Sequence, residues 1–151
     1  MIKIITVGKI KEEFIKDSLK EYLKRLSKYT KINIIEIEDD NSKDINKSLS
    51  TEKDKILKYI NEEDYIITLE IDGNMLDSIS LSKKIEELFI ESKKIVFIIG
   101  GSNGIHDDIK SRSNYKLSFS KLTFPHQLFR VILLEQIYRS FKIINKETYH
   151  K

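Results

Sequence analysis

Apolar residues in this chain gather in short runs that are separated by longer and more polar stretches. Four runs are rich in β-branched residues, as buried strands are: Ile2–Val7, Ile32–Ile37, Tyr65–Ile71 and Ile95–Ile99. Because these runs are apolar on both faces, they favour a parallel sheet that helices cover on both sides. A fifth strand is expected at Tyr115–Phe119.

The stretches between the runs carry apolar residues at helical spacing. They predict helices around residues 14–26, 45–60 and 81–89, although residues 39–55 are polar enough for part of the second helix to be loop. A last helix is expected to begin after Pro125, since proline suits the first turn, and to end near Ile144. Strands that alternate with helices predict an α/β fold, a mostly parallel sheet flanked by helices, in one domain over residues 1–151.

In such folds ligands bind outside the carboxyl ends of the strands. Four turns rich in glycine or polar residues follow the predicted strands and should share that edge of the sheet. They are Gly8-Lys9, Glu38–Asp40, Asp72–Asn74 and Gly100–Gly104.

Composition narrows the class of protein. The 151 residues are 40% hydrophobic and 34% charged, with no cysteine, which excludes disulfides, zinc–thiolate sites and cysteine nucleophiles. No apolar run approaches the roughly 20 residues of a membrane span, and the N-terminus has no signal-peptide pattern. We therefore expect a cytoplasmic protein with no membrane partner.

Charge is distributed unevenly along the chain. Residues 1–35 carry nine basic and four acidic side chains, residues 36–109 carry nine and eighteen, and residues 110–151 carry nine and two. If the two basic ends meet in the fold, they make a face suited to a polyanion. The alternative is that these lysines are simply solvated.

The glycine cluster Gly100–Gly104 follows a buried run but does not fit the common nucleotide motifs. A dinucleotide fingerprint needs Gly-x-Gly-x-x-Gly after the first strand, where this chain has only Gly8, and no Gly-Lys-Ser/Thr phosphate loop is present. The cluster is either part of a different ligand site or a plain turn from strand to helix.

Other catalytic chemistries find little support. The three histidines, His106, His126 and His150, lack the spacing of metal ligands, so no metal is expected. There is no Gly-x-Ser-x-Gly elbow for a serine hydrolase. The acid pairs Asp39-Asp40 and Asp107-Asp108 fit a loop and the first turn of a helix, where negative charge is favourable, better than they fit paired catalytic acids.

The last predicted helix carries Arg130 and Arg139 nine positions apart, so they point to different sides. One is a candidate for a ligand pocket and the other for a partner chain or an RNA phosphate, while an ion pair of Arg139 with Glu135 is the structural alternative. Apolar residues surround this helix nearly completely, which predicts burial on more than one side. A second copy of the chain is the simplest cover, which predicts a homodimer.

Taken together, these segments resemble the RlmH family, the SPOUT-class methyltransferases that act on a pseudouridine of bacterial 23S ribosomal RNA. The resemblance runs from end to end. Its most specific parts are the Leu-Thr-Phe-Pro-His stretch and the tail. The matching segments are Val7–Lys9, Thr68–Gly73, Ile98–Gly104, Leu117–His126, Arg130–Arg139 and Tyr149-His150.

The resemblance implies a C-terminal trefoil knot, which composition and periodicity do not reveal. It also implies a homodimer whose active sites are each completed by the partner. The implied cofactor is S-adenosylmethionine, held in the knot mostly by backbone groups. By position, its binding residues are Leu69, Gly100, Phe119, Ser120, Lys121, Leu122, Thr123 and Phe124.

The implied reaction moves a methyl group to N3 of a pseudouridine, a nitrogen that is a poor nucleophile until its proton leaves. A base, or a cation that stabilises the anion, is therefore useful. The candidates are His126, Arg130, Tyr149 and His150, with His150 or Arg130 preferred for the proton and His126 as an alternative that orients the loop after Pro125. The tail, Tyr149–Lys151, is expected to fold over the pocket and contact the target nucleotide.

The expected substrate is ribosomal RNA in the assembled ribosome, either the large subunit or the 70S particle, read through shape and phosphates. Two alternatives stay open: a SPOUT methyltransferase for another RNA base, and a ribosome-associated binding protein without catalysis. Candidate phosphate contacts are Lys24, Arg25, Lys28, Lys110, Arg112, Lys116 and Lys142.

Overall fold

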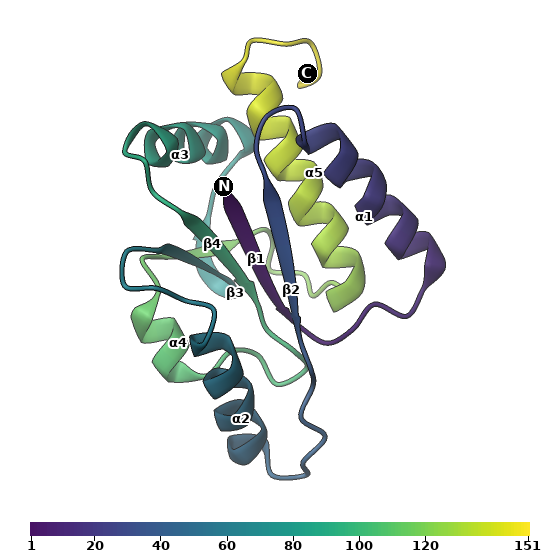
Figure 1. The fold of residues 1–151 in the computed structure, drawn as a ribbon, viewed down its shortest axis with the longest axis vertical. Coiled ribbons are helices and arrows are strands. Elements are labelled where there is room, and N and C mark those ends of the chain that lie inside the picture. Colours follow the sequence, from purple (N-terminus) through teal and green to yellow (C-terminus); the bar gives the residue numbers. More distant parts are fainter.

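The computed structural model describes residues 1–151 and shows ten elements in which strands and helices alternate (Figure 1). The strands are β1 (Ile2–Val7), β2 (Ile32–Ile37), β3 (Tyr65–Met75), β4 (Ile95–Ile99) and β5 (Tyr115–Ser118). The helices are α1 (Glu13–Leu26), α2 (Ile45–Leu57), α3 (Ser78–Ile90), α4 (Asp107–Arg112) and α5 (His126–Ile144).

All five strands belong to one parallel sheet with the order β2-β1-β4-β3-β5. Alternate residues of a strand face opposite sides of the sheet. In β1, Ile2 and Ile4 pack with α1, α3 and α5, whereas Ile5 and Val7 pack with α2 and α4. The prediction of a parallel sheet covered by helices on both sides is therefore confirmed.

The sequence predicted β1, β2 and β4 with the bounds that the structure has. One expectation at the other side of the sheet was wrong. The segment Asp72–Asn74 is not a turn after β3, because the strand continues to Met75. Its pairing with β5 is interrupted at residues 70–73, which bulge out of the register, and resumes at Asn74. Gly73 is needed there, since a Cβ atom would lie 2.8 Å from the backbone of Lys116. The fifth strand, expected around Tyr115–Phe119, is confirmed and spans Tyr115–Ser118.

Polar side chains fix the starts of three helices. Asp44 accepts hydrogen bonds from two backbone N–H groups at the start of α2, and Asp77 accepts one from Ser80 at the start of α3. His106 accepts one from Asp108 at the start of α4, so Asp107 and Asp108 form the first turn of a helix, as predicted. Residues 39–44 are loop, also as predicted.

The apolar faces of α5 are covered largely within the chain. Leu133, Leu134, Ile137 and Phe141 belong to the core that α5 shares with the sheet, α1 and α3. The apolar residues around this helix are therefore not by themselves an argument for a partner chain. Two neighbouring helices and the sheet bury most of them. No helix is both long and apolar enough to cross a membrane.

Candidate functional site

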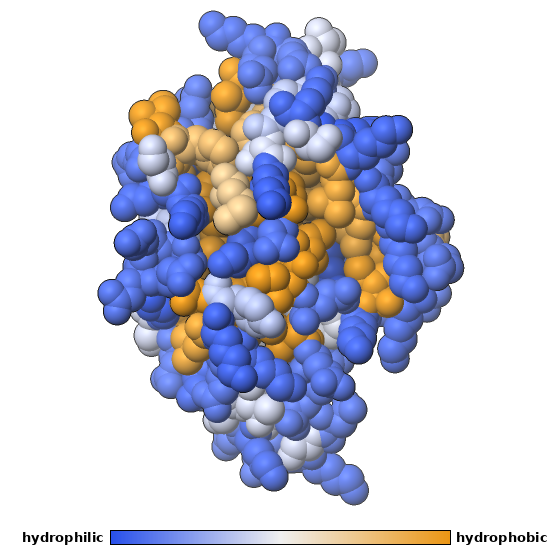
Figure 2. Space-filling model, viewed as in Figure 1, coloured by the Kyte–Doolittle hydropathy of each residue, from blue (hydrophilic) through white to orange (hydrophobic).

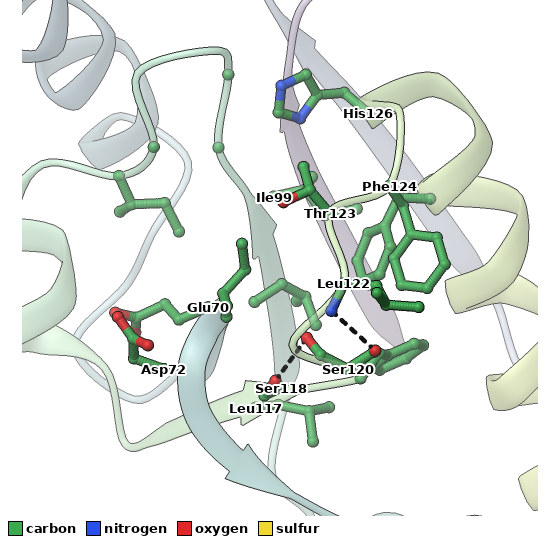
Figure 3. Close-up of a pocket in the computed structure, with 18 of the residues that line it drawn as sticks. Glu70, Asp72, Ile99, Leu117, Ser118, Ser120, Leu122, Thr123, Phe124 and His126 are labelled. Atoms are coloured by element: carbon green, nitrogen blue, oxygen red, sulfur yellow. Dashed lines mark hydrogen bonds between the residues drawn. The ribbon is translucent and has the colours of Figure 1, made fainter.

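A pocket of about 390 Å³ opens at the carboxyl edge of the sheet, where β3, β4 and β5 end (Figure 3). Its volume falls in the range of about 300–1,000 Å³ that is typical of small-molecule sites. One wall is the glycine turn after β4, a second is the segment that follows β5, and a third is the looped-out part of β3. The expected edge of the sheet thus carries the site.

The glycine turn can exist only with glycine at its start. A Cβ atom on Gly100 would lie 2.5 Å from the carbonyl oxygen of Gly104 and 2.8 Å from Ile105, closer than real Cβ atoms come. The N–H of Gly104 donates to the carbonyl of Gly101 at 3.1 Å, and Gly104 has a φ of +81°, which favours glycine. The turn therefore closes tightly and presents backbone rather than side chains to the pocket.

The opposite wall is the segment 118–124, which two serines hold in place. The Ser118 hydroxyl donates to the carbonyl of Ser120 at 3.1 Å, and the Leu122 N–H donates to the Ser120 hydroxyl at 3.0 Å (Figure 3). The N–H groups of Lys121, Thr123 and Phe124 donate to no other group of the protein. Since backbone N–H groups need partners, this wall is suited to hydrogen-bond a ligand.

The aromatic ring of Phe129 on α5 stiffens the same wall. Its centroid lies 5.0 Å from that of Phe119 and 5.9 Å from that of Phe124. Such separations are favourable for aromatic pairs. The segment between β5 and α5 is therefore packed at both of its ends, although its backbone is irregular.

Across the pocket lie two carboxylates that were not among the expected binding residues, Glu70 and Asp72 (Figure 3), although Asp72 was expected at this edge of the sheet. Glu70 accepts a 2.6 Å hydrogen bond from the Thr68 hydroxyl and lies 3.7 Å from the ammonium of Lys110. The signal for these residues was their place at the end of an apolar strand. Lys110, one of the candidate phosphate contacts, lines the pocket beside Glu70.

The structure brings together seven of the eight residues that the resemblance assigned to the cofactor. Lys121 is the exception, because its side chain is exposed and does not line the pocket. The other seven share the same hollow with the catalytic candidate His126. They are Leu69, Gly100, Phe119, Ser120, Leu122, Thr123 and Phe124.

Of the four catalytic candidates, His126 is the one that lines this pocket. It is the first residue of α5, and Figure 3 shows it beside Ile99 and Thr123 at one edge of the hollow. Its backbone belongs to the helix start that Pro125 introduces, where the Pro125 carbonyl accepts from the N–H of Phe129. The ring is exposed and free to meet a bound molecule.

Arg130 does not reach the pocket within one chain. Its side chain is 2% exposed, and its guanidinium donates to the carbonyls of Val7 and Gly8 and to the carboxylate of Glu36. Burial lowers the pKa of this guanidinium, while Glu36 opposes that effect. Arg130 thus joins the end of β1 to the end of β2 and to α5, far along the sheet from β3 and β5.

The tail lies against the other end of α5. The Tyr149 hydroxyl donates to Glu135 at 3.1 Å, and its ring packs on Tyr138 with 5.0 Å between the centroids. Burial and the bond to Glu135 raise the pKa of Tyr149 to about 12. His150 lies 3.2 Å from Arg139, which also forms the expected i,i+4 ion pair with Glu135. The tail is therefore held in place by the chain itself.

The tail and His126 do not meet within one chain. Thirteen residues of α5 separate His126 from Arg139, the partner of His150, which corresponds to about 20 Å along a helix. A second, apolar groove of about 570 Å³ lies between these points. It shares Leu117, Phe119 and Phe124 with the pocket and reaches His150 at its far end.

The parallel α/β sheet and the pocket at its carboxyl edge are compatible with a SPOUT-type methyltransferase, and comparison with known families shows that class. The family described as "Predicted SPOUT methyltransferase" matches residues 1–150. A solved structure of a probable methylase family protein from Haemophilus influenzae superposes with a TM-score of 0.59 at 12% identity. That similarity covers 99% of this chain and 70% of the other, and it supports the fold alone.

Relatives of similar length share about half of the sequence. Ribosomal RNA large subunit methyltransferase H of Clostridium kluyveri is 50% identical, and that of Clostridium botulinum is 52% identical. A protein of Methanococcus vannielii that carries this name provisionally is 57% identical. Each alignment covers 99% of both chains. The chain therefore belongs to the ribosomal RNA large subunit methyltransferase H family.

Proposed function

We propose that this protein is a methyltransferase that uses S-adenosylmethionine to methylate N3 of a pseudouridine in 23S ribosomal RNA. Membership of the family and the names of relatives that are 50–57% identical support an activity on ribosomal RNA. The observation that carries the proposal is the pocket at the carboxyl edge, with its two backbone walls. We take residues 1–151 as one cytoplasmic domain.

The pocket fits the parts of S-adenosylmethionine. The aromatic and aliphatic side chains of Leu117, Phe119 and Phe124 suit a flat adenine ring, and the free N–H groups of Thr123 and Phe124 suit its ring nitrogens. The carboxylates of Glu70 and Asp72 suit the hydroxyls or the ammonium of the cofactor. Binding of the cofactor by backbone groups accounts for the lack of a nucleotide-binding motif in the sequence.

When bound, S-adenosylmethionine supplies a methyl group on a positively charged sulfur. The chain's own residues must then take up the proton of N3 and hold the pyrimidine ring. His126 is placed to accept that proton, because it is exposed at the edge of the pocket and lines it beside Thr123. A general base of this kind typically contributes about 100- to 10,000-fold to the rate. Arg130 positions the start of α5 and takes no part in the proton step.

The active site is proposed to be completed by a second copy of the chain. Within one chain Tyr149 and His150 lie at the opposite end of α5 from His126, so they can approach a pocket only in a partner. The apolar groove beside α5 supports a dimer, because it borders the pocket on one side and His150 on the other. Leu122, which lines the pocket, and Leu128 on α5 are 71% and 41% exposed, and a partner chain could bury them.

The segment between β5 and α5 is also proposed to be part of a trefoil knot. The observation that supports it is that this segment and the turn after β4 form opposite walls of one pocket. A knotted chain must thread its end through a loop, which adds a slow step to folding. Refolding after complete denaturation should therefore show a slow phase that prolyl isomerase does not accelerate.

Methyl transfer from labelled S-adenosylmethionine tests the function directly. Assembled 70S ribosomes, free large subunits and naked ribosomal RNA are compared as substrates. Label at N3 of one pseudouridine in ribosome-borne RNA supports the proposal and identifies the assembly state that is recognised. If the cofactor binds but no RNA becomes labelled, the pocket is assigned correctly and the substrate is not.

A further inference from the structure

A regular row of lysines runs along α1 and the turn that follows it. Lys16, Lys20, Lys24 and Lys28 stand at four-residue intervals. Residues four apart on a helix are neighbours on one face, and each step advances about 6 Å. Lys20, Lys24 and Lys28 are exposed, and Lys16 is half-buried. We call these four residues the lysine stripe.

The two central lysines of the stripe make no ion pair that would stabilise the fold. Like charges four residues apart on a helix repel each other. Lys16 has Glu13 as a partner and Lys28 has Glu147, but Lys20 and Lys24, in the middle of the stripe, form no ion pair. The apolar side of α1 is already packed through Ile15, Leu19 and Leu26, so the lysines are not needed to cover the core.

The basic surface continues from the stripe onto the end of α5. Lys28 lies 3.5 Å from Glu147, which also accepts a 2.6 Å hydrogen bond from Lys142. Of the acids in this region, Glu21, Glu135 and Glu147 are each paired with a cation, while Asp17 on α1 is exposed and forms no ion pair. Lys20, Lys24, Lys146 and Lys151 also form no ion pair. The two basic ends of the sequence thus meet, and positive charge remains in excess.

This surface lies on one side of the molecule. α1 forms its outer edge, and the end of α5 with the tail lies above it in Figure 1. Figure 2 shows hydrophilic side chains along the outer side of α1 and around the tail. The acidic middle of the sequence contributes little here, because α2 and α4 pack on the opposite face of the sheet.

We propose that the lysine stripe binds the phosphate backbone of the RNA substrate, with the adjoining end of α5 extending the contact. The inference rests on the proposed function and adds the surface by which the RNA is held. Cations spaced evenly along one face suit a polymer of phosphates, and the two at the centre of the stripe, Lys20 and Lys24, are exposed and form no ion pair. An anionic membrane is a poorer match, because the apolar face of α1 that would enter lipid is buried against α5.

The test compares two double variants with the same change of charge. K20Q/K24Q removes the unpaired centre of the stripe. K43Q/K47Q is the matched control, since Lys43 and Lys47 are also exposed, four residues apart and without an ion pair, but lie at the start of α2. Binding of each variant to purified large ribosomal subunits is measured from about 50 to 200 mM salt.

We expect K20Q/K24Q to bind the subunits roughly tenfold more weakly and to reduce the slope of log affinity against log salt by about 1.5, as the loss of two phosphate contacts predicts. The control should match the unmodified protein. Binding of S-adenosylhomocysteine should be unchanged in both variants, and the thermal midpoint of K20Q/K24Q should stay or rise because repulsion is removed.

Equal affinities and equal salt slopes for the two double variants would overturn the inference, and so would a larger loss in the control. Failure of the proposed function has a different signature. In that case the unmodified protein transfers no methyl group to any RNA, whatever the binding of the variants shows. Loss of binding to vesicles of anionic lipid, with subunit binding intact, would assign the stripe to a membrane instead.

Discussion

The two ends of α5 satisfy their polar groups in opposite ways. At its start, the pocket wall leaves the N–H groups of Lys121, Thr123 and Phe124 without partners in the protein. At its end, two carboxylates each accept hydrogen bonds from more than one side chain. Glu135 accepts from Arg139 and Tyr149, and Glu147 accepts from Tyr29 and Lys142.

The difference separates a surface that awaits a small molecule from a segment that is already positioned. Backbone N–H groups that have no partner in the protein can donate to a ligand without breaking a bond within the fold. A terminal segment is usually frayed unless it is tied down. The tail is tied down, so it can present Tyr149 and His150 without a large loss of conformational freedom on binding.

The largest expected effect comes from removing the positioned segment. Deletion of Tyr149–Lys151 should reduce methyl transfer to background, because the groups that would contact the nucleotide are gone. The dissociation constant for S-adenosylhomocysteine, measured by calorimetry, should change little, since the tail does not line the pocket. Deletion of Lys151 alone is the control. Near-normal turnover in the longer deletion would remove the tail from the mechanism.

The next effect falls on the glycine turn. In G100A the new Cβ atom would meet the backbone of Gly104 at 2.5–2.7 Å, so the turn must open and the pocket wall must move. We expect S-adenosylhomocysteine to bind roughly 100-fold more weakly, in line with the cost of overpacking. G104A is the matched control. Its Cβ atom would meet nothing within 4 Å, and only its φ of +81° costs stability, about 1 kcal/mol.

If both glycine variants weaken cofactor binding equally, the close contact at Gly100 does not determine the shape of the pocket. Chemical denaturation of the same two proteins separates loss of the fold from loss of the pocket. A G100A protein that unfolds at the same denaturant concentration as G104A but binds more weakly places the effect in the pocket.

A smaller effect is expected from Arg130, which lies at the pocket end of α5 but acts on the fold. R130M leaves the carbonyls of Val7 and Gly8 without their partner and should lower the free energy of unfolding by about 2–3 kcal/mol. R130K keeps the charge and should recover part of the loss. Urea unfolding measures both. An R130M protein that is stable but inactive would contradict this expectation and indicate that Arg130 takes part in catalysis.

The smallest effect concerns the pH range over which the tail stays docked against α5. Lys142 and Tyr29 lower the pKa of Glu147 to about 2, so its contribution is complete above the ordinary value of 4.5 and is lost as pH falls toward 2. Tyr149, whose pKa is raised, has its effect at alkaline pH. Its contribution is complete below 10 and is lost as pH rises toward 12.

The resonances of the Tyr149 ring report whether the tail is docked. Between about pH 5 and 9 they should stay constant, and they should shift toward those of a free tyrosine at either extreme. In E147Q the acidic transition should disappear while the alkaline one remains. A tail that undocks near neutral pH would contradict this account.

The sequence determined the parts of this protein that depend on local burial. Short β-branched runs predicted β1, β2 and β4 with correct bounds, because strands buried on both faces leave a continuous apolar signal. The parallel arrangement then placed the Gly100–Gly104 turn at the ligand edge. The resemblance to a family supplied the second wall, and the structure brings seven of its eight cofactor residues to one pocket.

Only the tertiary structure decided which side chains meet across the fold. The partners of Arg130 are more than 90 residues away in sequence, so no local pattern shows that its side chain is buried. The same holds for Glu70 and Lys110, and for the return of β3 to β5 after residues 70–73. Periodicity records how deeply a residue is buried, whereas strand order and the folded path of the chain determine its neighbours.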